Sequence, residues 1–96
     1  MYARVTSFTL GPGTRPIAEN LAADVARHFT SAAGLRSIIF LANWDTGEYG
    51  TFQVWETKEA ADAALPAIRQ IFDAKAAGML KGAPIRLSYE VFEPKL

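Results

Sequence analysis

The sequence of 96 residues contains no cysteine, which excludes disulfide bonds, thiolate nucleophiles and cysteine-based metal sites. A single histidine likewise excludes a centre built from several histidines, so we expect no metal. Ten basic and ten acidic side chains balance to a formal net charge of zero, without a basic cluster. We therefore expect neither nucleic acid nor a membrane surface as a partner.

Long apolar runs are also missing. No window approaches the ~20 apolar residues of a membrane span, and the first twenty residues hold no apolar core of signal-peptide length. A cytoplasmic protein is the default expectation. The composition is globular, with 50% hydrophobic and 21% charged residues. It suits a single domain over residues 1–96 with a small core.

Four segments have the composition and spacing of β-strands. The second is almost continuously apolar, which is typical of a strand buried on both faces. A tight-turn signal at 45–47 joins it to the third strand as a hairpin. The predicted strands cover residues 2–10, 36–44, 48–55 and 85–93.

Two helices are predicted between these strands, from apolar residues that recur every three or four positions. The first begins with Thr14 as N-cap and ends at Gly34. The second begins after Thr57 and carries Pro66 in its interior. Because a proline inside a helix removes a hydrogen bond and clashes with the preceding turn, we expect a break near Leu65.

The order of the elements predicts an α+β fold, the ferredoxin-like βαββαβ sandwich. It has a four-stranded antiparallel sheet with two helices on one face. The strand at 36–44 is nevertheless apolar on both sides, with Ile38 and Phe40 on one and Ile39 and Leu41 on the other. Two helices cover only one sheet face, so the other face would be an exposed apolar patch. We therefore expect a homodimer packed sheet against sheet.

Residues 54–60 read VWETKEA and lie at a strand-to-helix junction that follows a hairpin. Together with the glycine-containing turn after the first strand, this run resembles the antibiotic biosynthesis monooxygenase (ABM) family. The resemblance covers essentially the whole chain in its order of elements. It implies a dimeric α+β barrel and, as in some members, oxidation of polycyclic phenols by dioxygen with no cofactor.

The sequence departs from the family's pattern in the second helix. Members often carry a histidine about nine residues after the junction tryptophan, where this chain has Ala63, Ala64 and Leu65. A related branch degrades haem with an asparagine on the first strand and a tryptophan and a histidine on the second helix. Here the first strand offers Thr6 and Ser7, and that helix has neither residue. Haem degradation is therefore not the expected activity.

His28 and Asp24 are the candidate catalytic residues. His28 falls about 40° from the centre of the apolar stripe of the first helix, so it points toward the sheet. Asp24, one turn earlier, would hold one imidazole nitrogen and make the other more basic. Such a base removes a phenolic proton, after which the phenolate can give an electron to dioxygen. The alternative is a boundary histidine packed over the core and hydrogen-bonded to Asp24 or a carbonyl.

Seven further residues are candidates for contact with a planar aromatic ligand. The flat rings of Trp55 and Trp44 suit such a ligand, although tryptophan at a strand end also packs in cores and interfaces. Arg4 either binds an anionic oxygen of the ligand or pairs with Glu90 on a neighbouring strand. The full set is Trp55, Trp44, Arg4, Thr6, Phe8, Asn43 and Tyr89.

The sequence favours two functions, and an isomerase or a haem-handling protein on the same scaffold is a third interpretation. One is a cofactor-independent monooxygenase-like protein that binds a polycyclic phenol between its helices and its sheet. The other is a non-catalytic module of the same fold, which binds a small ligand or only dimerises. The sequence names neither the ligand nor the pathway, because one fold hosts many reactions.

Overall fold

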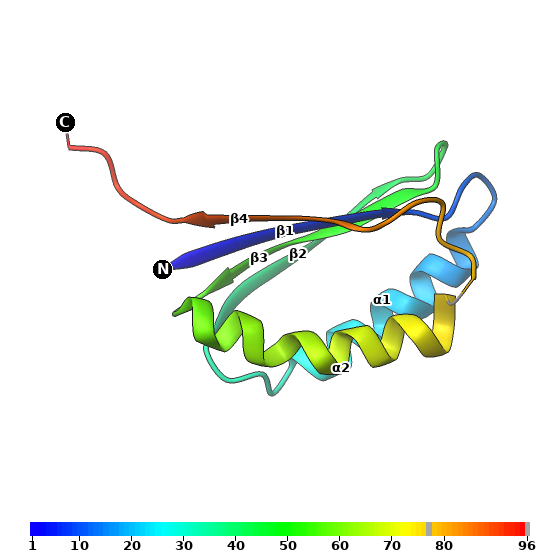
Figure 1. Cartoon of the computed structure of the whole chain (residues 1–96). Helices are drawn as coiled ribbons and strands as arrows, with labels where there is room; N and C mark the ends of the chain where they lie inside the picture. Colours follow the sequence, from blue (N-terminus) through cyan, green and yellow to red (C-terminus); the bar gives the residue numbers. More distant parts are fainter. Residues whose placement is uncertain (77, 96) are drawn as a thin grey trace.

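The computed structural model describes residues 1–76 and 78–95. The chain forms six elements in the predicted order (Figure 1). No helix in the described part of the chain is long and apolar enough to cross a membrane. The elements are β1 (Tyr2–Thr9), α1 (Arg15–Phe29), β2 (Leu35–Asn43), β3 (Glu48–Trp55), α2 (Lys58–Ala76) and β4 (Ile85–Glu90).

The four strands form one antiparallel sheet in the order β2-β3-β1-β4. Each helix connects two strands that are separated in the sheet by a third, so two βαβ units interleave. Both helices lie on the same face of the sheet (Figure 1). The predicted ferredoxin-like sandwich is confirmed.

The core lies between this inner face and the helices. Its fully buried side chains are Trp55 on β3 and Leu21 on α1, and Val25 and Phe29 continue the apolar stripe of α1. Alternation along the strands decides which residues reach this core. On β1 the inner positions are Arg4, Thr6 and Phe8, and the positions between them face outward.

The helix α2 runs without a break through Pro66, so the predicted interruption near Leu65 is wrong. Pro66 lies on the exposed side of the helix. The carbonyl that loses its helical donor belongs to Asp62, which is also exposed, so water can take the place of that donor and lower the penalty. The other helix, α1, ends earlier than expected, at Phe29, because residues 30–34 turn the chain into β2 and Gly34 adopts a φ of 83°.

Two further sequence assignments are corrected at the edges of the elements. Thr14 does not cap α1 with its side chain; its hydroxyl donates instead to the carbonyl of Gly11 at 2.7 Å. The last strand ends at Glu90 rather than at residue 93.

Gly47 in the hairpin has a φ of 72°, and a Cβ there would lie 1.7 Å from the Gly11 carbonyl oxygen. The hairpin therefore packs tightly on the turn that precedes α1.

Candidate functional site

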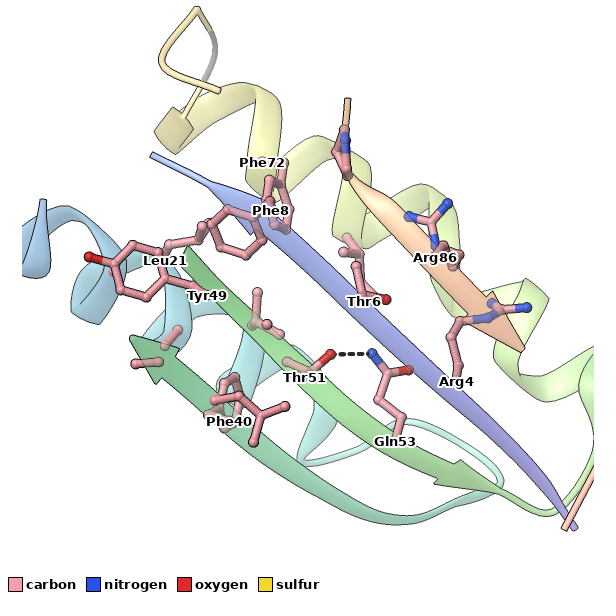
Figure 2. Close-up of a pocket in the computed structure, with 18 of the residues that line it drawn as sticks. Arg4, Thr6, Phe8, Leu21, Phe40, Tyr49, Thr51, Gln53, Phe72 and Arg86 are labelled. Atoms are coloured by element: carbon pink, nitrogen blue, oxygen red, sulfur yellow. Dashed lines mark hydrogen bonds between the residues drawn. The ribbon is translucent and has the colours of Figure 1, made fainter. Parts of the chain in front are cut away.

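A cavity of about 470 Å³ lies between the inner face of the sheet and the two helices. This volume falls within the ~300–1,000 Å³ of small-molecule sites. Figure 2 shows that its walls divide into two ends. One end carries the aromatic rings of Phe8, Tyr49 and Phe72, and the other carries Arg4, Thr6, Thr51, Gln53 and Arg86.

The register of the sheet creates these two ends. Arg4 lies opposite Gln53, Thr6 opposite Thr51, and Phe8 opposite Tyr49 on the paired strands β1 and β3. Because alternate residues of a strand share a face, these three pairs stack in order along the cavity wall. The polar pairs therefore occupy one half of the wall, and the aromatic pair occupies the other.

At the aromatic end, neighbouring rings fix one another. Phe8 meets Phe72 of α2 edge to face, with ring centroids 4.7 Å apart, and lies 5.9 Å from Tyr49. The oxygen of the Tyr49 hydroxyl is 2.9 Å from the Thr14 hydroxyl oxygen. Thr14 gives its only hydroxyl proton to a backbone carbonyl, so Tyr49 must be the donor of that bond. The ring of Tyr49 is thereby held at its polar tip.

At the polar end, three side chains form a hydrogen-bond relay with a fixed direction. The indole nitrogen of Trp55 donates to Oε1 of Gln53 at 2.9 Å, and Nε2 of Gln53 donates to the Thr51 hydroxyl at 2.9 Å. An indole N–H can only donate, so it determines which end of the Gln53 amide faces Trp55. Thr51 accepts a hydrogen bond from Gln53, so its own O–H remains available as a donor. The relay makes Thr51 a preoriented donor for an oxygen atom of a ligand.

Arg4 is buried, and its charge is balanced by Asp62 on α2. Its Nη2 lies 2.7 Å from Oδ1 of Asp62 and 3.4 Å from the Tyr2 hydroxyl. The hydrogen bond from Arg4 lowers the pKa of Asp62 below its usual value, against a smaller opposing effect of burial. The predicted partner Glu90 is wrong, because the sheet places Ser88 opposite Arg4 and Glu90 opposite Tyr2.

This ion pair predicts a loss of stability in acid. The pKa of Asp62 is lower in the folded chain than the ~3.9 of an unfolded aspartate. The pair therefore stabilises the fold fully above about pH 4, and this contribution disappears as the pH falls through the folded-state pKa. We expect Asp62→Asn to lower the urea midpoint at about pH 6 but to leave a much smaller difference from the wild type at about pH 2.

A matched control is Glu56→Gln, which removes an exposed pair with Arg36 at 3.4 Å. Exposed pairs contribute little, so its midpoint should follow the wild type at both pH values. A difference between Asp62→Asn and the wild type that does not change with pH would contradict the assigned role of Asp62.

Of the predicted site residues, Arg4, Thr6, Phe8 and Trp44 line the cavity. Trp44 lies 5.7 Å from Tyr49 between ring centroids, and the Arg15 guanidinium lies over the Trp44 ring, 4.1 Å from its centroid. Arg4, Thr6 and Phe8 come from one face of β1, as predicted, and Trp44 directly follows β2.

Trp55 is placed differently from its predicted role as a stacking wall. Its side chain is fully buried and packs edge to face on Phe29 at 5.6 Å, so it does not line the cavity. Its contribution to the site runs through Gln53. Trp55 therefore contributes to the site through a hydrogen bond and not through direct contact with the cavity.

The expected dyad of His28 and Asp24 does not form. Asp24 pairs with Arg27 on its own helix and with Lys75 of α2 at 3.2 Å. The hydrogen bond from Lys75 is the main cause of the lowered pKa of Asp24. The ring of His28 packs beside Phe29 at 5.5 Å between centroids, and neither His28 nor Asp24 lines the cavity.

Asn43 and Tyr89 also lie outside the cavity. The Asn43 side chain accepts hydrogen bonds from the backbone N–H groups of Asp45 and Thr46, at 3.1 and 3.2 Å, and so organises the hairpin turn. Tyr89 lies on the outer face of β4 and is 54% exposed. Its hydroxyl points away from the inner face because it alternates with Ser88.

The sequence analysis missed Tyr49, Thr51, Phe72 and Arg86 as lining residues. The strand pairing would have revealed two of them, since Tyr49 and Thr51 lie directly opposite the predicted Phe8 and Thr6. In the described part of the chain, no group of three or more acidic or histidine side chains is arranged to hold a metal ion.

Known structures share this fold over nearly their full length. A monooxygenase from Streptomyces coelicolor in complex with nanaomycin D superposes with a TM-score of 0.76 at 20% identity, covering 99% of this chain and 90% of that one. An antibiotic biosynthesis monooxygenase superposes with a TM-score of 0.81 at 10% identity, covering 97% and 100%. SnoaB, a cofactor-independent oxygenase from Streptomyces nogalater, gives 0.75 at 20% identity, covering 97% and 94%.

The sequence itself matches no protein-family model and no curated protein. The structural neighbours are ABM-family proteins, and the resemblance in the order of elements extends to three dimensions. Identities of 10–20% support the shared fold and not a shared reaction.

Proposed function

We propose that the cavity binds a planar aromatic phenol and that the protein oxidises it with dioxygen without a cofactor. The observation that carries this proposal is the division of the cavity into an aromatic end and a hydrogen-bonding end. Phe8, Tyr49 and Phe72 supply flat apolar walls, and Thr51 supplies an oriented donor for a ring oxygen. The structural likeness to a cofactor-independent oxygenase agrees with it.

The chemistry requires the phenol to be ionised. A donor that bonds more strongly to the charged oxygen than to the neutral one lowers the pKa of the bound phenol, and Thr51 is placed to do this. At an activated ring CH₂, enolisation moves one hydrogen from that carbon to the ring oxygen, and ionisation of this phenolic enol gives a phenolate that shares its charge with the same carbon. This anion transfers one electron to dioxygen, the radical pair combines to form a C–O bond at that carbon, and the peroxide anion takes up a proton. Loss of water from this hydroperoxide leaves a carbonyl, so that CH₂ and O₂ become C=O and H₂O.

The proton does not need His28 or Asp24 in this scheme. Neither residue lines the cavity, and the Asp24 carboxylate is bound to Lys75 and Arg27. The phenolic proton leaves through the open side of the cavity to solvent. What the protein contributes is orientation of the ring and stabilisation of the developing negative charge.

The test combines binding with oxygen uptake. A dihydroxyanthrone, which has both a phenol and an activated CH₂, should quench the fluorescence of Trp44 saturably and consume one O₂ per molecule. Thr51→Val keeps the volume of the side chain and removes the donor, so we expect binding to weaken about three- to tenfold and oxygen uptake to fall at least as much.

Two results would change the conclusion. Saturable quenching with no oxygen uptake above the protein-free rate would favour the alternative, a non-catalytic module that binds aromatic ligands. The absence of a histidine from the cavity lining already favours that alternative over an oxygenase with a histidine base. If no tricyclic phenol binds, neither the oxygenase nor the non-catalytic aromatic-binding module is supported.

We infer further that the protein acts as a homodimer through the outer face of its sheet. The residues Ile39, Phe52, Val5 and Leu87 lie opposite one another across all four strands and form an apolar row. The accessible surface of the chain is 6233 Å², whereas a folded monomer of this mass has about 5,400 Å². A second copy on this face would cover the excess.

A further inference from the structure

Three arginines from three elements line the polar end of the cavity. Arg4 comes from β1, Arg86 from the neighbouring strand β4, and Arg69 from α2. Figure 2 shows the side chains of Arg4 and Arg86 together on the side of the cavity away from Phe8 and Tyr49. The proposed oxidation of a phenol does not use these charges. These positive charges favour a negatively charged group of a ligand at this end of the cavity.

We propose that Arg86, Arg4 and Arg69 form a subsite for a carboxylate group carried by the aromatic ligand. This inference rests on the proposed use of the cavity as an aromatic site, and it adds the chemical class of the ligand, an aromatic acid. A carboxylate and a phenolate are both oxyanions that arginine side chains bind, and the donors at this end of the cavity favour the carboxylate.

The positive charge at this end is only partly neutralised by the protein. Among residues 1–76 and 78–95, neither Arg69 nor Arg86 takes part in an ion pair, and Arg4 shares Asp62 with Lys58. Two carboxylates line the cavity, Glu19 and Asp73. Glu19 is bound to Arg15 at 2.8 Å, so of the lining carboxylates only Asp73 is left to balance the three guanidinium groups, besides the Asp62 that is bound to Arg4.

The arginines also repel one another. Burial is the main cause of the lowered pKa of Arg86, and the charges of Arg4 and Arg69 lower it further. Placing three like charges in one cavity wall is unfavourable unless an anion binds among them. A ligand carboxylate would remove this repulsion.

Hydrogen-bonding capacity at Arg4 is also unused. Both of its bonds to described side chains come from Nη2, and its buried Nε has no partner among them. A guanidinium presents its donors as a planar fork that matches the two oxygens of a carboxylate. The neutral donor Thr51 suits a phenolic oxygen instead, and so the two oxygen types have separate positions.

The pairing of the strands sets the distance between the position for a phenolic oxygen and the position for a carboxylate. Thr51, Thr6 and Arg86 lie in one row across β3, β1 and β4. Neighbouring strands are about 4.8 Å apart, so the backbones of Thr51 and Arg86 are separated by roughly 10 Å. A ligand of two or three fused rings can span this distance with a hydroxyl at one end and a carboxylate at the other.

The test compares two ligands that differ only in charge, anthraquinone-2-carboxylate and anthraquinone-2-carboxamide, by quenching of tryptophan fluorescence. We expect the carboxylate to bind at least about tenfold more tightly, with a preference that declines as salt is added. Arg86→Gln should reduce this preference, measured as the ratio of the two affinities in the same variant. Arg86 is exposed on an edge strand, so the variant is expected to fold. Arg36→Gln, an exposed position outside the cavity, is the control and should keep the preference.

The outcomes separate this inference from the proposed function. Equal binding of the two ligands to the wild type would overturn the carboxylate subsite and leave the aromatic site intact. Binding of neither ligand would overturn the aromatic site and the subsite with it. A phenolate is the other oxyanion that these arginines could bind. This alternative is tested by titrating bound 2-hydroxyanthraquinone with pH and following its absorbance, which gives the pKa of its hydroxyl. If Arg86→Gln raises the pKa of that hydroxyl without changing the preference for the carboxylate, the arginines serve a phenolate and the proposal is wrong.

Discussion

Replacing Phe52 by glutamate is expected to convert the proposed dimer into monomers. Phe52 lies on the central strand β3 in the middle of the apolar row and is 38% exposed in the single chain. Its neighbours across the strands are Ile39 and Val5, which offer no partner for a carboxylate. In a two-fold dimer the substitution occurs twice, so two unpaired charges would be buried at once.

The expected effect is large. An uncompensated charge in a buried interface costs about 3 kcal/mol or more, so two cost about 6 kcal/mol, which weakens association about 10⁴-fold. Sedimentation equilibrium or light scattering at micromolar concentration would detect the change. Ala63→Glu places the same charge on the exposed side of α2 and should remain dimeric. A wild type that is monomeric at all concentrations, or a Phe52→Glu variant that stays dimeric, would contradict the proposed interface.

The fold could be predicted from the sequence because each element has a local signal. The apolar stripe of α1 and the hairpin turn at 45–47 place their elements within a few residues of the observed bounds. The error at Pro66 has a physical cause. The cost of a proline depends on whether the carbonyl that it leaves unbonded is buried or hydrated, and the sequence does not show which side of the helix is exposed.

The site was harder to predict because it depends on contacts between distant segments. Arg4, Thr6 and Phe8 were identified since they share one face of one strand, which is a local property. Of the two partners of Asp24, Lys75 was missed because it lies on the other helix, about fifty residues away in sequence. A pair one helical turn apart, such as Asp24 and His28, is visible in the sequence, but a cross-helix ion pair is not.

Trp55→Phe is expected to damage the site although Trp55 does not touch the cavity. The substitution removes the indole donor that orients the Gln53 amide, and the amide can then turn away from Thr51. We expect binding of a hydroxyanthraquinone to weaken about five- to tenfold, which corresponds to the loss of about one hydrogen bond. The fold should also lose roughly 1–2 kcal/mol because the smaller ring leaves a void in a fully buried position.

Stability and binding are separated by a double-mutant cycle with Thr51→Val. If Trp55 acts through Gln53 and Thr51, both changes break the same relay. The affinity of the double variant for the hydroxyanthraquinone should then be about that of whichever single variant binds it less tightly. Leu10→Ala is the control, since it opens a void in the core outside the cavity lining and does not touch the relay, so it should lower stability and leave binding unchanged. Effects of Trp55→Phe and Thr51→Val that add in full would show that Trp55 only packs the core.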